Sequence, residues 1–185
     1  MLHYHYVSVP DCAHHYDEDK RLAFRHSRTE FITTVKYIEK YLKAEHRILE
    51  IGAGTGAYSH YFAQQGYPVD SVELVEHNID IFKSKTQPDE RITIRQGNAL
   101  DLCEFCDSTY DITLLLGPMY HLYTAEEQLK AMSEAIRVTK KGGIIFAAYC
   151  GNDNKLGKTP TNDVVIRFSG DSGDGMQLTG TLFSE

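Results

Sequence analysis

The sequence lacks any long uninterrupted apolar segment. None of its apolar runs approaches the length of about 18 residues that a membrane-spanning helix requires. The first residues, beginning Met1-Leu2-His3, also lack the basic and apolar regions that make up a secretory signal peptide. The sequence therefore predicts a cytoplasmic protein that does not contact a membrane.

Basic residues are in the minority. The chain has 19 lysines and arginines against 26 aspartates and glutamates, which gives a formal net charge of −7. General nucleic-acid binding requires a basic footprint on the protein surface. Nucleic acid is therefore not an expected partner, whereas small molecules and proteins remain open as substrates.

Cysteine is also scarce, with four residues in a chain of 185. Disulfides are not expected in a reducing compartment. Cys103 and Cys106 form one C-x-x-C pair, but a structural zinc site needs four ligands and no second pair stands at the required spacing. The histidines near the start, such as His3 and His14, follow no fixed helical spacing. No metal site is predicted.

What the chain does contain is a short apolar strand that runs into alternating glycines. Residues 48–51 are apolar apart from Glu50, and Gly52, Gly54 and Gly56 follow before a helical segment begins. Glycines let the backbone turn sharply and approach a ligand closely, and the following helix offers free N–H groups. The pattern G-x-G-x-x-G/A, completed by Ala57, also fits a dinucleotide site. Glu50 favours a ligand with a cationic ammonium group over a dinucleotide, because a carboxylate suits an ammonium group better than it suits a pyrophosphate.

Strand and helix patterns alternate along the rest of the chain. Apolar residues three and four apart predict a helix over residues 22–44. Strands are predicted at residues 47–51, 68–75, 91–96, 110–116 and 143–150, and helices up to residue 65, at 76–85 and at 124–139. This alternation predicts an α/β fold: a Rossmann-like, doubly wound, mostly parallel sheet with helices on both faces.

Polar residues stand where the predicted strands end. Glu73 lies near the end of the second predicted strand, where its carboxylate is placed to accept both hydroxyls of a ribose. A buried strand rarely carries such a group for structural reasons alone, since an unpaired buried charge is costly. Asn98 follows the third strand and fits equally well a contact with an adenine edge or a turn. The loop at residues 117–121 follows the fourth strand. In such sheets these loops meet at one edge, where strand order reverses.

These motifs resemble the class I S-adenosylmethionine-dependent methyltransferases of the small bacterial, UbiE-like type, over about residues 16–150. Residues 50–56 match the first motif of that family, Glu73 matches its ribose-binding acid, and Asn98-Ala99 stands at its adenine position. The stretch Leu-Gly-Pro-Met-Tyr-His-Leu at residues 116–122 is similar to a stretch of one uncharacterised subgroup.

The resemblance implies S-adenosylmethionine as the cofactor, S-adenosylhomocysteine as its product and methyl transfer to a small-molecule acceptor that it does not identify. The cofactor-binding residues that it implies are Glu50, Gly52, Ala53, Gly54, Thr55, Gly56, Glu73, Leu74, Asn98, Ala99 and Leu116. An NAD(P)-binding oxidoreductase is the alternative that the glycine spacing leaves open.

Methyl transfer from a sulfonium needs alignment more than acid or base catalysis. If the acceptor keeps a proton, His121 is the candidate general base, because its ordinary pKa lies near neutrality and the loop after the fourth strand faces the methyl group. Packing of His121 against Tyr120 and Tyr123 is the alternative. Tyr16 and Arg21 are weaker candidates, as residues of an N-terminal arm or lid over residues 1–25.

The end of the chain does not fit this family. We divide the chain into the arm, a cofactor-binding domain at residues 26–158 and an atypical tail at residues 159–185. The tail resembles the start of a 2-oxoacid:acceptor oxidoreductase subunit, which suggests a fusion junction near residues 151–161 and allows for a non-catalytic product. Alternatively, residues 164–169 and 177–183 pair as a hairpin in place of the last two strands of the family.

Overall fold

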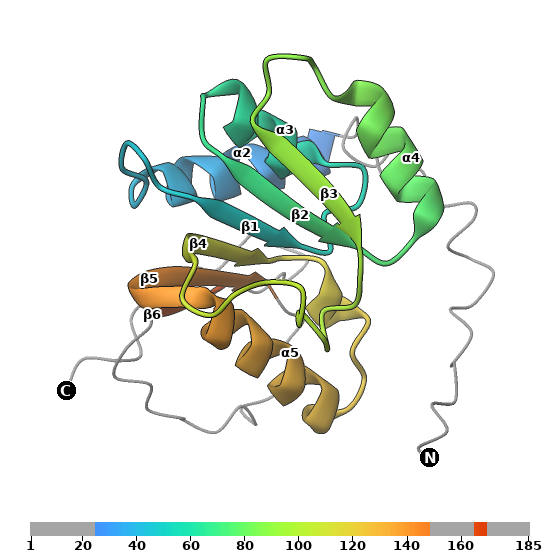
Figure 1. Ribbon diagram of the computed structural model, residues 1–185, viewed down its shortest axis with the longest axis vertical. Helices are drawn as coiled ribbons and strands as arrows, with labels where there is room; N and C mark the ends of the chain where they lie inside the picture. Colours follow the sequence, from blue (N-terminus) through green and yellow to red (C-terminus); the bar gives the residue numbers. More distant parts are fainter. Residues whose placement is uncertain (1–24, 149–164, 170–185) are drawn as a thin grey trace.

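The computed structural model describes residues 25–148 and 165–169 (Figure 1). In chain order these residues form α2 (Arg25–Glu39), β1 (Ile48–Ile51), α3 (Ala57–Gln64), β2 (Val69–Glu73), α4 (Glu76–Lys85), β3 (Ile92–Gln96), β4 (Tyr110–Leu115), the 3-10 turn η2 (Pro118–Tyr120), α5 (Ala125–Val138), β5 (Thr139–Ala148) and β6 (Val165–Ser169). Most of the predicted arm and tail lies outside these residues, as do the proposed junction and residues 177–183.

The strands form one sheet in the order β3-β2-β1-β4-β5-β6, and every pairing between described strands is parallel. The chain moves outward from β1 to β3 and then returns to place β4 on the other side of β1. Strand order therefore reverses between β1 and β4. The predicted parallel α/β fold is confirmed, and β6 extends the sheet beyond β5.

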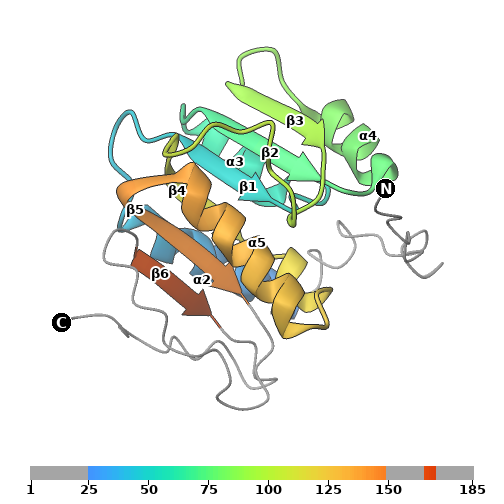
Figure 2. The same cartoon turned by 60° about the horizontal axis from the view of Figure 1, so that its bottom comes forward.

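Helices cover both faces of this sheet (Figure 2). On one face, α2 and α3 bury Val35, Ile38 and Phe62 against the sheet. On the other, Ala131 and Ala135 of α5 pack into a second core, together with the segment between β3 and β4. None of the helices in the described part of the chain is long and apolar enough to cross a membrane.

The start of β5 differs from the sequence prediction. The sequence predicted a helix at residues 124–139 and a strand from residue 143, but α5 ends at Val138 and β5 begins at once with Thr139. Tyr110 pairs with Thr139 whereas Ile112 pairs with Ile144, so β5 carries extra residues at this point. Gly142 provides the positive φ of 78° that this irregularity requires. The lysines and glycines thus form a bulge inside the strand.

Candidate functional site

The glycine turn (residues 52–56) follows β1, the strand on which the sheet reverses its order. The φ angles of Gly52, Gly54 and Gly56 are 73°, 55° and 88°. These values lie in the left-handed region, which costs energy for any residue that has a Cβ. The N–H groups of Gly52 and Ala53 both donate to the carbonyl oxygen of Val72, at 2.8 and 3.0 Å. The turn is therefore anchored to the neighbouring strand β2.

The loop after β4 lies directly against this turn. A Cβ on Gly52 would stand 2.6 Å from Cγ and Cδ of Pro118, and a Cβ on Gly117 would stand 3.1 Å from the carbonyl oxygen of Gly52. Leu116, which precedes this contact, is partly buried. The carboxyl ends of β1 and β4 thus meet where strand order reverses, which is where open α/β sheets bind ligands.

Glu73 joins the glycine turn to the turn that follows β2. Its side chain is only 7% exposed, and Oε2 accepts a hydrogen bond of 2.8 Å from the N–H of Gly54. Oε1 accepts bonds from the N–H of Val75, at 2.9 Å, and from Nδ2 of Asn78, at 3.3 Å. The expected convergence of Glu73 on the glycine turn is therefore present.

Asn78 is a member of this group that sequence reasoning missed. It lies in the first turn of α4, five residues after Glu73, and its own N–H donates to the carbonyl oxygen of Val75 at 3.1 Å. The signal that could have revealed it is an amide side chain in the first turn of the helix that follows an acid at the end of a buried strand.

Glu50 lies deeper than Glu73. It is 3% exposed, and its carboxylate accepts a hydrogen bond from the hydroxyl of Ser59 in α3, which is itself 2.8 Å from the hydroxyl of Ser71 in β2. The carboxylate therefore ties β1 to the helix that starts at the glycine turn. Its predicted contact with an ammonium group stays a prediction, and Ser59 is a partner that the sequence did not reveal.

The rest of the glycine turn is supported by contacts behind it. Ala53 and Thr55 are buried. The ammonium group of Lys85, at the end of α4, donates to the carbonyl oxygen of Thr55 at 3.4 Å. A Cβ on Gly56 would stand 2.4 Å from the buried ring of Phe82, so α4 packs directly against the start of α3.

The residues predicted to contact adenine differ in their exposure to solvent. Asn98 is exposed, and its Oδ1 accepts a 3.0 Å bond from the N–H of Leu100, which is the turn that we weighed as the alternative. Ala99 is buried in the core beside it. Leu74, next to the buried Glu73, is 44% exposed. The adenine role of these residues stays a prediction.

His121 directly follows η2, and its backbone N–H donates to the carbonyl oxygen of Pro118 at 2.9 Å. Its side chain is exposed, Tyr123 beside it is 85% exposed, and no ring contact among the described residues involves His121. No ring contact in this part of the structure supports the alternative in which His121 packs against its tyrosine neighbours, and that alternative stays a prediction. The role of His121 as a base stays a prediction as well. Tyr16 and Arg21 lie outside the described residues.

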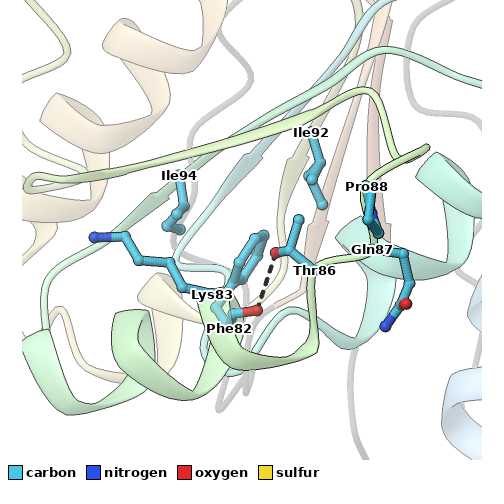
Figure 3. A pocket seen from close by; sticks show the side chains of 7 residues that line it. All are labelled: Phe82, Lys83, Thr86, Gln87, Pro88, Ile92 and Ile94. Carbon is cyan, nitrogen blue, oxygen red and sulfur yellow. Dashed lines mark hydrogen bonds between the residues drawn. The ribbon is translucent and has the colours of Figure 1, made fainter.

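A pocket of about 390 Å³ lies elsewhere, between α4 and β3 (Figure 3). Its lining is mostly apolar and includes Ile92, at the amino end of β3, so the pocket extends away from the carboxyl edge that holds Glu73. The residues that line it are Phe82, Lys83, Thr86, Gln87, Pro88, Ile92 and Ile94. No group of three His, Cys, Asp or Glu side chains able to hold a metal occurs in the described segments.

Known proteins are similar to this chain in sequence or in fold. A demethylmenaquinone methyltransferase of Clavibacter sepedonicus is 32% identical over 103 residues, which is 55% of this chain and 40% of that protein. The crystal structure of the PH0226 protein from Pyrococcus horikoshii matches with a TM-score of 0.61 and 19% identity, over 83% of this chain and 66% of that one. The glycopeptide N-methyltransferase MtfA, complexed with S-adenosyl-L-homocysteine, matches with a TM-score of 0.51 and 18% identity, over 58% and 47% of the two chains.

These matches cover only part of the known proteins. The chain spans 35–45% of the length of three curated relatives that it matches. The sequence model of the family described as "Methyltransferase domain" matches residues 49–147, which is more than half of the chain and runs from β1 to β5. The chain therefore belongs to this methyltransferase domain family.

Proposed function

We propose that this domain binds S-adenosylmethionine at the carboxyl edge of its sheet and transfers the methyl group to a small-molecule acceptor. The observation that carries the proposal is the bond between Oε2 of Glu73 and the N–H of Gly54. It brings a carboxylate suited to a ribose within one hydrogen bond of a glycine turn suited to the rest of the nucleoside. The family membership and the S-adenosyl-L-homocysteine complex of MtfA support the same ligand.

The residues around this bond supply complementary contacts. Glu73 would accept hydrogen bonds from the ribose hydroxyls, and the exposed side chain of Leu74 would lie against an apolar ring. Asn98 uses its Oδ1 for the turn, so Nδ2 is left to donate to an adenine ring nitrogen. The glycine turn lets the backbone come close to the amino-acid part of the ligand.

The chemistry supplied by the bound cofactor is an already activated methyl group on a sulfonium. The protein's contribution is therefore to hold donor and acceptor in line and to keep water away, and such positioning is worth up to about 7–11 kcal/mol. His121, exposed after β4, is the candidate to take a proton from an acceptor that retains one. Replacing His121 with asparagine should lower turnover and leave the affinity for S-adenosylhomocysteine nearly unchanged.

Calorimetric titration tests the proposal directly. S-adenosylhomocysteine should bind the wild-type protein, and Glu73→Ala should weaken binding at least tenfold. Asp80→Ala is the matched control, because it removes an exposed carboxylate from α4 without touching the glycine turn. Heat with NAD or NADP, and none with S-adenosylhomocysteine, would select the oxidoreductase alternative and refute the proposal.

A further inference from the structure

The carboxylate of Glu73 is nearly saturated with donors from the protein itself. An ionised carboxylate offers about four acceptor positions. Here the N–H groups of Gly54 and Val75 and the amide of Asn78 occupy three of them, two on Oε1 and one on Oε2. A single hydroxyl can be added without rearrangement, on Oε2. A ribose offers two adjacent hydroxyls, so the second requires one of the three donors to move.

Asn78 is the donor that can move. The bonds from Gly54 and Val75 come from backbone N–H groups that the glycine turn and the first turn of α4 hold in place, and they measure 2.8 and 2.9 Å. The bond from Asn78 is longer, at 3.3 Å, and comes from a side chain that can rotate. Its Cα is fixed, because Ile79 beside it is buried in the core.

We propose that Asn78 and Glu73 form a two-residue ribose-recognition unit. Before binding, the amide of Asn78 holds the Glu73 carboxylate toward the glycine turn. When a nucleoside binds, the ribose hydroxyl takes the position of Asn78 on Oε1, and the displaced amide donates to the oxygen of the same hydroxyl. Asn78 is thus a positioning residue for Glu73 and a second reader of the ribose. This inference rests on the proposed function, because it assumes that Glu73 binds the ribose.

The test compares two ligands on three variants by calorimetry. The ligands are S-adenosylhomocysteine and its 2′,3′-dideoxy analogue, which differ only in the two ribose hydroxyls. Asn78→Ala removes the amide, and Asn78→Asp replaces it with a carboxylate that repels Glu73 without changing the shape of the side chain. Asp80→Asn, on the exposed side of α4, is the control.

For S-adenosylhomocysteine we expect the dissociation constant to rise about threefold to tenfold in Asn78→Ala and more than tenfold in Asn78→Asp. For the dideoxy analogue, the dissociation constants of both Asn78 variants should stay within about twofold of the wild-type value. An equal loss for both ligands would mean that Asn78 only supports the fold, and no loss for either would mean that it plays no part. Both results overturn the inference, and thermal unfolding of each variant identifies a loss of fold.

The result for Glu73 separates this inference from the proposed function. Suppose that Glu73→Gln lowers the affinity for S-adenosylhomocysteine but not for the dideoxy analogue, while each Asn78 variant changes the two affinities equally or not at all. In that case only the role of Asn78 fails. If wild type binds neither ligand, or binds both equally well with Glu73→Gln unchanged, the ribose role of Glu73 fails and the inference falls with it.

Discussion

Replacing Gly52 with alanine tests the contact between the glycine turn and the loop after β4. An L-residue at φ 73° costs about 1–2 kcal/mol by itself. The new Cβ would also stand 2.6 Å from two ring carbons of Pro118, and such overpacking costs a further 1–3 kcal/mol, roughly. The turn cannot shift freely to relieve the clash, because the N–H of Gly52 is bonded to Val72.

Gly52→Ala should therefore lower the free energy of unfolding by about 2–5 kcal/mol, or Tm by roughly 5–15 °C for a chain of this size. Gly66→Ala is the matched control, since Gly66 has a similar positive φ of 89° but no atom within 4 Å of the position that a Cβ would take. It should show the backbone cost of about 1–2 kcal/mol alone. The affinity for S-adenosylhomocysteine, measured by calorimetry, should fall at least tenfold in Gly52→Ala and stay unchanged in Gly66→Ala.

A second substitution isolates the clash from the backbone strain. Pro118→Ala removes the two ring carbons that the new methyl group would meet, so the double variant should recover the overpacking cost of about 1–3 kcal/mol and keep the backbone cost. Urea unfolding of the four proteins gives the coupling energy. Equal costs for Gly52→Ala and Gly66→Ala, with no recovery from Pro118→Ala, would refute the packing of the two loops.

Three further substitutions test the framework around the site. Burial raises the pKa of Asp70, but hydrogen bonds from Thr93, Tyr110 and the charged Arg47 together outweigh burial and hold the pKa below its ordinary value. The ionised Asp70 carboxylate therefore stabilises the folded protein fully above about pH 4, and this contribution is lost as the pH falls through the lower folded-state pKa. Asp70→Asn should flatten the pH dependence of the free energy of unfolding in urea over this acidic range. Thr124→Ala removes the capping box of α5 and should cost about 1 kcal/mol in thermal unfolding. Arg137→Met loses bonds to two backbone carbonyls between β3 and β4 and should speed amide hydrogen exchange there.

Much of the sheet followed from the sequence because its strands are short, apolar and separated by helical patterns. Residues 48–51 and 110–115 lie in the two central strands, and both runs are apolar enough to be buried on both faces. The start of β5 did not follow. Two lysines and two glycines fit the end of a helix and a bulge in a strand equally well, and the choice depends on which residues of β4 lie opposite.

The site was predictable only where one residue carries the signal by itself. Glu73 was found because a carboxylate at the end of a buried strand costs free energy unless it has a hydrogen-bond partner or a ligand. Asn78 was not found, because its role depends on the turn at Val75 and on the rotation of α4, which bring its amide to one carboxylate oxygen. The partner of Glu50 was hidden in the same way, since the rotation of α3 decides which hydroxyl faces it.

The contacts at the carboxyl edge differ in kind between its two sides. On the side proposed to bind the nucleoside, Gly52 lies against Pro118 and Glu73 bonds to Gly54, so contacts among three loops hold this side together. A site held in this way loses little conformational entropy on binding, which favours affinity for one fixed ligand. On the other side His121 is exposed and bonded only through its backbone among the described residues. Substitutions on the nucleoside side should therefore change cofactor affinity, whereas substitution of His121 should change turnover with little effect on that affinity.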